Sequence, residues 1–184
     1  YAFADTIVRH VDARELEIPY WLMTYTELCD LLIERSEREA TNQTAFFRDC
    51  LLEGRQTENG SATAALGLPR VTVDTPIYFS LDEVIAKVRA KNVERVGNRQ
   101  GPMFGDFDRF LMRIESKLND TRYDFLLKPT KRNSSASLSA MLRDFVGLGA
   151  QKAAVTVIDL SSVPFDVRPT VAAQIGRLAF EFNY

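Results

Sequence analysis

The chain has 184 residues, of which 46% are apolar and 26% are charged. That length suits one ordinary domain, or one domain with part of another, and the apolar share excludes a disordered tail. Lys and Arg total 23 and Asp and Glu total 25, giving a net charge of -2. This balance excludes a histone-like coat of positive charge, although it leaves room for a local basic patch.

Cysteine and histidine are scarce. Cys29 and Cys50 are too few for a secreted disulfide framework, and because both fall on apolar helical faces we interpret them as core residues rather than nucleophiles. His10 is the single histidine, which excludes a multi-histidine metal site, and we interpret it as a surface residue. No apolar stretch reaches the length of a membrane span and no signal-peptide pattern opens the chain. We therefore expect a cytoplasmic location and no membrane partner.

Three helix-start signals of the form [S/T]-x-x-E occur before residue 84. In such a capping box the hydroxyl and the carboxylate each bind a backbone N–H group that the first helical turn leaves unpaired. Apolar residues at helical spacing follow each signal, so each predicts a helix. The pairs are Thr24 with Glu27, Ser36 with Glu39, and Ser80 with Glu83.

A fourth helix has the strongest signal, because apolar residues recur at spacings of three and four from Met103 to Leu118. The polar, small-residue stretch 54–69 predicts a flexible loop, and Gly97–Gly105 interrupts the helical pattern. Four helices with one apolar stripe each predict a helical bundle over 22–119.

The pattern then changes to an alternation of strands and helices, which predicts an α/β fold for 120–184. The apolar, β-branched second strand is typical of a parallel sheet covered on both faces. Gly147 follows the first helix at the position that glycine favours after a helix C-terminus. The expected elements are a strand at 123–127, a helix at 138–145, a strand at 153–160 and a helix at 168–182.

No phosphate-binding loop of the form G-x-x-x-x-G-K-[S/T] occurs in the chain. Asp159 ends an apolar strand, where α/β proteins bind ligands, so one interpretation is a magnesium-linked acid. Its neighbour is Leu160, however, where a hydrolysing ATPase usually carries a second acid. The alternative that we favour is that Asp159 or Ser161 caps a turn shaped by Pro164.

Basic residues gather in two stretches. Such clusters suit phosphate backbones, but they equally suit solvated helix faces or subunit contacts. The nearby phenylalanines have core spacing and do not resemble a base-stacking platform. The candidate DNA-binding residues are Arg95 and Arg99 in the first stretch, and Lys128, Lys131 and Arg132 in the second.

Four stretches, in the same order, resemble motifs of HerA-type ATPases of the HerA/FtsK superfamily. The first resembles the continuation of that family's Asp-Pro-His-Gly-Glu-Tyr motif, and the others are similar to its L-x-I-P-Y-W-L, L-x-D-x-R-Y-D-F and I-D-L-S-x-(L/V)-P motifs. The stretches are Tyr1-Ala2-Phe3-Ala4, Leu16-Glu17-Ile18-Pro19-Tyr20-Trp21-Leu22, Leu118-Asn119-Asp120-Thr121-Arg122-Tyr123-Asp124-Phe125 and Val157-Ile158-Asp159-Leu160-Ser161-Ser162-Val163-Pro164.

The resemblance implies a partial RecA-like P-loop NTPase sheet (1–21 and 120–184) with an inserted helical bundle (22–119). It implies a homo-hexameric, ATP- and Mg²⁺-dependent translocase or helicase on double-stranded DNA. Such proteins act with a nuclease such as NurA, or with another effector, in DNA end processing or antiphage defence. In the family the phosphate loop precedes this region and the Walker B acids follow it. The chain has no Met at its start and stops in an apolar run, so we expect an inactive internal fragment in which no residue is catalytic and no ATP or metal is bound.

Two alternatives remain at this stage. One is a non-catalytic helical module that binds a partner protein, with the α/β part as scaffold. The weaker one is a small α/β enzyme using Asp159 and Ser161, although no histidine lies near them to activate the serine.

Overall fold

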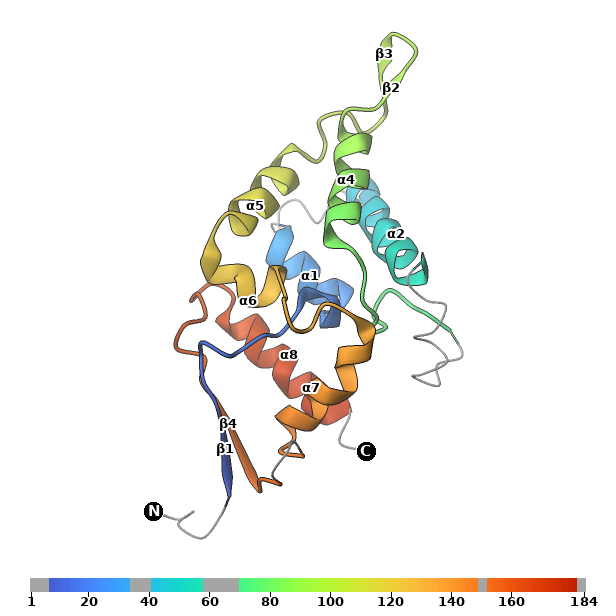
Figure 1. The fold of residues 1–184 in the computed structure, drawn as a ribbon. Coiled ribbons are helices and arrows are strands. Elements are labelled where there is room, and N and C mark those ends of the chain that lie inside the picture. Colours follow the sequence, from blue (N-terminus) through green and yellow to red (C-terminus); the bar gives the residue numbers. More distant parts are fainter. Residues whose placement is uncertain (1–6, 34–40, 58–69, 149–151, 182–184) are drawn as a thin grey trace. The chain divides into compact units, whose positions relative to one another are not determined.

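The computed structural model describes residues 7–33, 41–57, 70–148 and 152–181. The chain divides into two compact units: unit 1 combines residues 1–20 with 121–184, and unit 2 is residues 21–120. In chain order the elements are β1 (Val8–Val11), the 3₁₀ turn Tyr20–Leu22, α1 (Tyr25–Leu32), α2 (Thr41–Thr57), α4 (Leu81–Asn92), β2 (Arg95–Val96), β3 (Arg99–Gln100), α5 (Asp108–Leu118), the 3₁₀ turn Thr121–Tyr123, α6 (Asp124–Leu127), the 3₁₀ turn Ser135–Ser137, α7 (Leu138–Phe145), β4 (Val155–Ile158) and α8 (Arg168–Glu181) (Figure 1).

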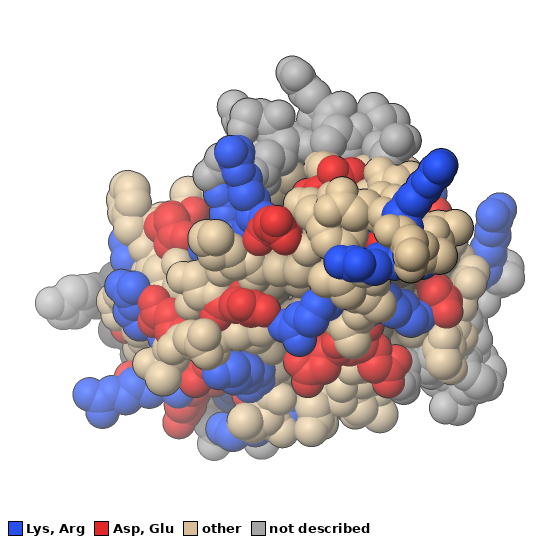
Figure 2. Space-filling view, turned by 90° about the horizontal axis from the view of Figure 1, so that it is seen from above, with Lys and Arg blue, Asp and Glu red and all other residues tan. Residues whose placement is uncertain are grey.

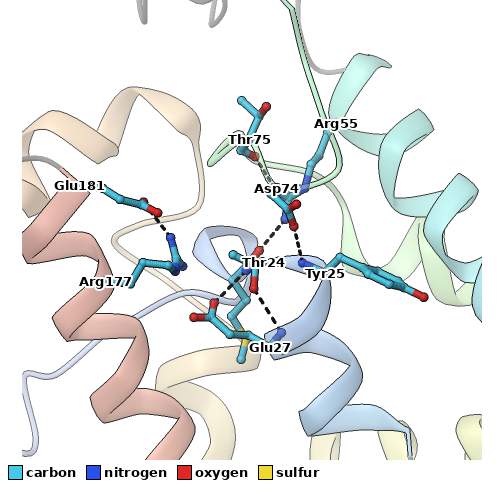
Figure 3. Close-up of polar contacts among 9 residues, drawn as sticks. Thr24, Tyr25, Glu27, Arg55, Asp74, Thr75, Arg177 and Glu181 are labelled. Carbon is cyan, nitrogen blue, oxygen red and sulfur yellow. Dashed lines mark hydrogen bonds and ion pairs between the residues drawn. The ribbon is translucent and has the colours of Figure 1, made fainter. Parts of the chain in front are cut away.

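Two of the three predicted helix starts in unit 2 are confirmed. The Thr24 hydroxyl accepts the Glu27 N–H at 3.2 Å and the Glu27 carboxylate accepts the Thr24 N–H at 2.8 Å, so the capping box of α1 is complete (Figure 3). Ser80 caps α4 by accepting the Glu83 N–H at 3.2 Å. The pair of Ser36 and Glu39 lies outside the described residues, although the helix expected after it is present as α2.

Helix α2 runs through Thr57, so the prediction of a loop beginning at residue 54 is wrong for its first four residues. The reason is a buried cation. Arg55 is fully buried and donates hydrogen bonds to the carbonyl oxygens of Met23 and of Thr75 (Figure 3). Its guanidinium lies 5.1 Å from the centre of the Phe79 ring. Satisfying that side chain requires the helix to continue to it, which outweighs the weak helix propensity of the neighbouring glycine.

Within the described part of unit 2, α2 packs on α4, and α5 packs on both α4 and α1. Aromatic side chains fill the centre: Phe47 and Phe110 have ring centroids 5.1 Å apart, and Phe46 and Phe107 5.7 Å. Helix α5 is shorter than predicted and begins at Asp108, because residues 101–107 form successive turns that include Gly105 at φ 80°.

Unit 1 contains a small parallel sheet, which confirms an α/β fold and the predicted strand within 153–160. Strand β4 pairs with β1 in the register Val8 to Val155 through Val11 to Ile158. The sequence pattern did not predict β1. The expectation that both faces of β4 are covered is wrong within the described residues, because Val157 is 43% exposed.

The prediction of a strand at 123–127 is also wrong, since these residues form the end of a 3₁₀ turn and α6. Tyr123, Leu126 and Leu127 are buried, a spacing of three and four that matches one face of a helix. The Phe125 carbonyl accepts the Ile18 N–H at 3.0 Å, so this short helix is tied to the segment that precedes unit 2.

The predicted helix end at Gly147 is confirmed in detail. The Leu148 N–H donates to the Arg143 carbonyl at 2.7 Å and the Gly147 N–H donates to the Asp144 carbonyl at 3.3 Å, which is the Schellman pattern with Gly147 at φ 72°. A β-carbon at this glycine would lie 2.5 Å from the Ala153 carbonyl oxygen, in the segment leading to β4. The glycine therefore ends α7 and lets the chain turn back closely.

Among the described residues, no helix has both the length and the apolar character needed to cross a bilayer.

We predict that Gly147→Ala lowers the free energy of unfolding by at least about 2 kcal/mol, because the new methyl group meets both an unfavourable φ and a close carbonyl oxygen. Gly176→Ala is the matched control. Gly176 lies within α8 with open space around it, so alanine there stabilises the helix by about 0.5–1 kcal/mol. Denaturant unfolding of the three proteins measures both effects, and equal stability of the Gly147→Ala variant and the wild type would contradict the first.

Candidate functional site

Two of the predicted DNA-binding residues, Arg95 and Arg99, lie on a β-hairpin that extends from the end of α4 in unit 2 (Figure 1). Val96 pairs with Arg99 across a two-residue turn of Gly97 and Asn98. Gly97 has φ 62° and Asn98 does not have a positive φ, which fits a type II′ turn, whose twist matches that of paired strands. The hairpin is therefore a regular one with a turn sequence suited to it.

The base of the hairpin is fixed by Asn92, which is buried at the end of α4. Its side-chain amide donates to the Asp108 carboxylate at 2.7 Å, its side-chain oxygen accepts the Phe107 N–H at 2.7 Å, and its carbonyl accepts the Gly105 N–H at 2.9 Å. Gly101 closes the base by donating its N–H to the Glu94 carbonyl at 2.9 Å. These bonds hold an otherwise unpacked element in one position relative to α4 and α5.

All residues from Arg95 to Gln100 are exposed, so the hairpin adds nothing to the core of unit 2. The Arg95 guanidinium lies 5.9 Å from the centre of the Phe104 ring. This cation–π contact restricts the orientation of the guanidinium, which stays exposed to solvent. Figure 2 shows that basic side chains over the face in view are interspersed with acidic ones rather than forming a field of one sign. The hairpin therefore offers local contacts rather than long-range attraction.

The other three predicted residues lie in unit 1, beside a pocket of about 460 Å³. Its walls come from the segment after β1, from the turn and helix at 121–125, from the segment after α6, and from Ser162 in the segment after β4. Because β1 and β4 are parallel, the segments that follow them meet at one edge of the sheet, where α/β proteins place ligands. Four basic and three acidic residues line the pocket: Arg14, Arg122, Lys128 and Lys131, with Glu15, Glu17 and Asp124.

Glu17 organises one wall of the pocket. Its carboxylate accepts the backbone N–H groups of Thr130, Lys131 and Arg132 at 3.2, 3.0 and 2.7 Å, and the Thr130 hydroxyl also donates to it at 3.2 Å. Three consecutive N–H groups converging on one anion form a nest, so the negative charge is compensated locally by the backbone. The segment 130–132 is thereby held against the segment that follows β1.

Lys128 and Lys131 line the pocket, whereas Arg132 is held inside unit 1. Lys128 forms an ion pair with Asp124 at 3.3 Å, and its side chain is 51% exposed. Arg132 donates to the Glu17 carbonyl, lies 3.8 Å from the Asp144 carboxylate and sits 5.3 Å from the centre of the Phe145 ring. Burial lowers the pKa of Arg132. Because its side chain is already engaged with Glu17, Asp144 and Phe145, Arg132 would have to leave these partners to contact a phosphate.

Sequence reasoning did not single out two basic residues of this pocket. Arg14 follows β1, a strand that the sequence pattern did not reveal, and Arg122 lies within a stretch that was noted only for its family resemblance. Both are exposed. The signal that was available for Arg14 is its position just after the apolar residues Val8 and Val11.

Asp159 has the turn-capping role favoured above. Its carboxylate accepts the Ser161 N–H at 2.8 Å, and this bond lowers the pKa of Asp159. Ser162, next in the chain, donates its hydroxyl to the Ala13 carbonyl at 3.0 Å and so joins the segments that follow the two strands. Within the described part of the chain, no group of three or more His, Cys, Asp or Glu side chains could hold a metal ion.

Cys29 and Cys50 are both buried and form no disulfide bond, in agreement with the interpretation that they are core residues. Burial raises the pKa of the Cys50 thiol from its ordinary value of 9.0 to about 11. The thiolate is the reactive form, so this position is protected from thiol chemistry near neutral pH.

We predict that Cys50 makes wild-type stability fall as the pH rises above about 9. Because the folded pKa lies above the unfolded value, the stabilisation is complete below pH 9.0 and is lost toward pH 11, the folded value being about 11. Burial also raises the pKa of Tyr25 from 10.0 to about 12, so Tyr25 adds a loss of stability above pH 10 that the wild type and the Cys50→Ala variant share. Denaturant unfolding between pH 8 and 11 checks this: Cys50→Ala should lose less stability than the wild type over that range, and parallel losses would contradict the prediction.

Comparison with known proteins places these features in a family. No curated protein matches the chain. The family model described as "Helicase HerA, central domain" matches residues 1–179, which include all of unit 2 and most of unit 1. The chain therefore belongs to the family of HerA helicase central domains.

Proposed function

We propose that the protein containing this chain is an ATP-driven translocase on double-stranded DNA that works as a homo-hexameric ring. The observation that carries the proposal is the family match over residues 1–179. The described features agree with it: a small parallel sheet in unit 1, a helical unit formed by residues 21–120, and exposed arginines on a hairpin. We assign 1–21 and 120–184 to a RecA-like domain and 22–119 to a bundle inserted in it.

The residues present do not fit an ATP–magnesium site. The chain has no glycine-lysine phosphate loop. The acids that directly follow the two strands, Asp12 after β1 and Asp159 after β4, each accept a backbone N–H of the turn that follows, from Arg14 and Ser161 at 2.8 Å. We therefore place ATP and Mg²⁺ binding in the intact protein outside the residues of this chain. No catalytic residue is assigned here, and the role of this part is to supply the framework of the sheet and the helical unit.

Within this proposal the basic residues bind DNA through its phosphates, with little dependence on base sequence. The hairpin is the better placed of the two groups, because Arg95 and Arg99 are exposed on an element with a fixed base. Lys128 and Lys131 form the second contact. The predicted role of Arg132 would compete with its contacts to Glu17 and Asp144.

We further propose that the translocase works with a nuclease of NurA type or with another effector enzyme, in DNA end processing or in antiphage defence. This part follows from family membership. The intact protein should hydrolyse ATP faster with duplex DNA present than without it, and this chain alone should not hydrolyse ATP. An intact protein with no ATPase activity would overturn the proposed function.

A second function is favoured by one observation. The hairpin and the end of α4 before it expose apolar as well as basic groups, with Val96 at 68% and Val93 at 58% exposure. Those side chains suit a partner protein better than a phosphate backbone, and they support a non-catalytic interaction module as the alternative. The parent sequence separates the two, because a phosphate loop before this region and acidic residues after it belong only to the motor.

We predict that replacing Arg95 and Arg99 with alanine weakens duplex DNA binding about tenfold or more and lowers the magnitude of the salt slope by about 2, since each lost phosphate contact removes about 0.9. Fluorescence anisotropy over a salt series measures both values. The matched control is Arg48→Ala, which removes an exposed arginine from α2 in the same unit and should leave binding unchanged. An unchanged salt slope in the double variant would contradict the assignment of the hairpin.

A further inference from the structure

We infer that the pocket of unit 1 is a binding site for a phosphate group, with Arg14 and Lys131 as its principal ligands. The pocket has a volume of about 460 Å³, within the range of sites that take small molecules or part of a larger ligand. It lies at the edge of the sheet where the chain leaves β1 and β4, the usual place for a ligand in α/β proteins. This inference does not depend on the translocase function, since it rests on the geometry of unit 1.

The walls of the pocket are already fixed by bonds within unit 1. The Glu17 carboxylate holds the segment 130–132 through three backbone N–H groups, the Ile18 N–H is bonded to the Phe125 carbonyl, and the Ser162 hydroxyl is bonded to the Ala13 carbonyl. Each bond joins two different walls. A ligand therefore meets a formed site and does not have to order it, which reduces the entropic cost of binding.

The charge that remains available in the pocket is positive. Of the three acids that line it, Glu17 directs its carboxylate to backbone N–H groups and Asp124 is paired with Lys128 at 3.3 Å. That leaves the exposed Glu15 carboxylate against two cations. By contrast, Arg14 and Lys131 are exposed, line the pocket, and form no ion pair with any described residue. An anion is favoured over a metal cation for this reason.

Phosphate suits these side chains better than a carboxylate ligand. An arginine fork binds two oxygens of either anion, but a phosphate group has further oxygens, and at neutral pH often more charge, for a lysine to bind. Arg122 and the Thr121 hydroxyl also line the pocket and widen the set of groups that can face the remaining oxygens. A nucleic-acid backbone and a free nucleotide both carry such a phosphate, and the same chemistry serves both.

The test uses the whole 184-residue chain. Inorganic phosphate is titrated into the wild type, into the double variant Arg14→Ala with Lys131→Ala, and into the control Lys152→Ala, which removes an exposed lysine of unit 1 that does not line the pocket. Heteronuclear NMR shifts give the affinity and show which backbone amides respond. We expect millimolar binding that shifts amides at 13–17 and 121–131, a loss of at least tenfold in the double variant, and no change in the control.

A second variant separates charge from folding. Arg14→Lys with Lys131→Arg keeps both charges and should retain phosphate binding within about threefold, while circular dichroism confirms that all variants melt at the wild-type temperature without ligand. Wild-type protein that shows no phosphate-dependent shifts at these amides, or a double variant that binds as tightly as the wild type, would overturn the inference.

Competition identifies the source of the phosphate. If a 20-base-pair duplex displaces inorganic phosphate and binds more weakly to the double variant, the ligand is a nucleic-acid backbone. If ATP displaces it and the duplex does not, the ligand is a nucleotide; either result supports a phosphate site. If the wild type shows no phosphate binding at these residues while the intact protein has DNA-stimulated ATPase activity, the inference is overturned and the proposed function still stands.

Discussion

The contact on which unit 1 depends most is the one between the Glu17 carboxylate and the backbone N–H groups of Thr130, Lys131 and Arg132. It joins parts of the chain more than 110 residues apart, as the separations of 113 to 115 residues show. A buried carboxylate is costly unless it is fully bonded, and here the backbone supplies the bonds. The same interaction compensates an acidic charge that would otherwise face the pocket, so a structural bond also sets the electrostatic character of the site.

The two units present basic groups in different ways. In unit 2 the arginines stand on a hairpin with no buried residue, and its position is set by Asn92 and Gly101 at the base. In unit 1 the basic residues surround a concave pocket whose walls are bonded to one another. A projecting ribbon and a formed pocket recognise different parts of a ligand, the first a groove or surface and the second a single group. Under the proposals made above, each unit therefore recognises its ligand in a different way.

How much the sequence predicts depends on whether a feature is local. The capping box of Thr24 with Glu27 and the helix end at Gly147 were predicted because each is decided within a few residues. The continuation of α2 past residue 54 was missed because it depends on carbonyl groups of Met23 and Thr75, which are distant in the chain. Strand β1 was missed for the same reason, since four residues become a strand only when β4 lies beside them. The pocket follows this rule too: its lysines were identified from local charge, whereas Arg14 is placed there by the strand pairing.

The hydrogen bond between Ile18 and Phe125 affects how well the protein tolerates sequence changes in residues 21–120. Within unit 1, this bond joins the segment that leads into residues 21–120 to the segment that follows them. The intervening hundred residues then behave as one large loop with fixed ends, and loop-closure entropy grows only slowly with length. Insertions, deletions or wholesale exchange of that region can therefore accumulate over evolution without altering the host framework. Grafting another helical cassette between these two anchor points is a practical route to chimeras.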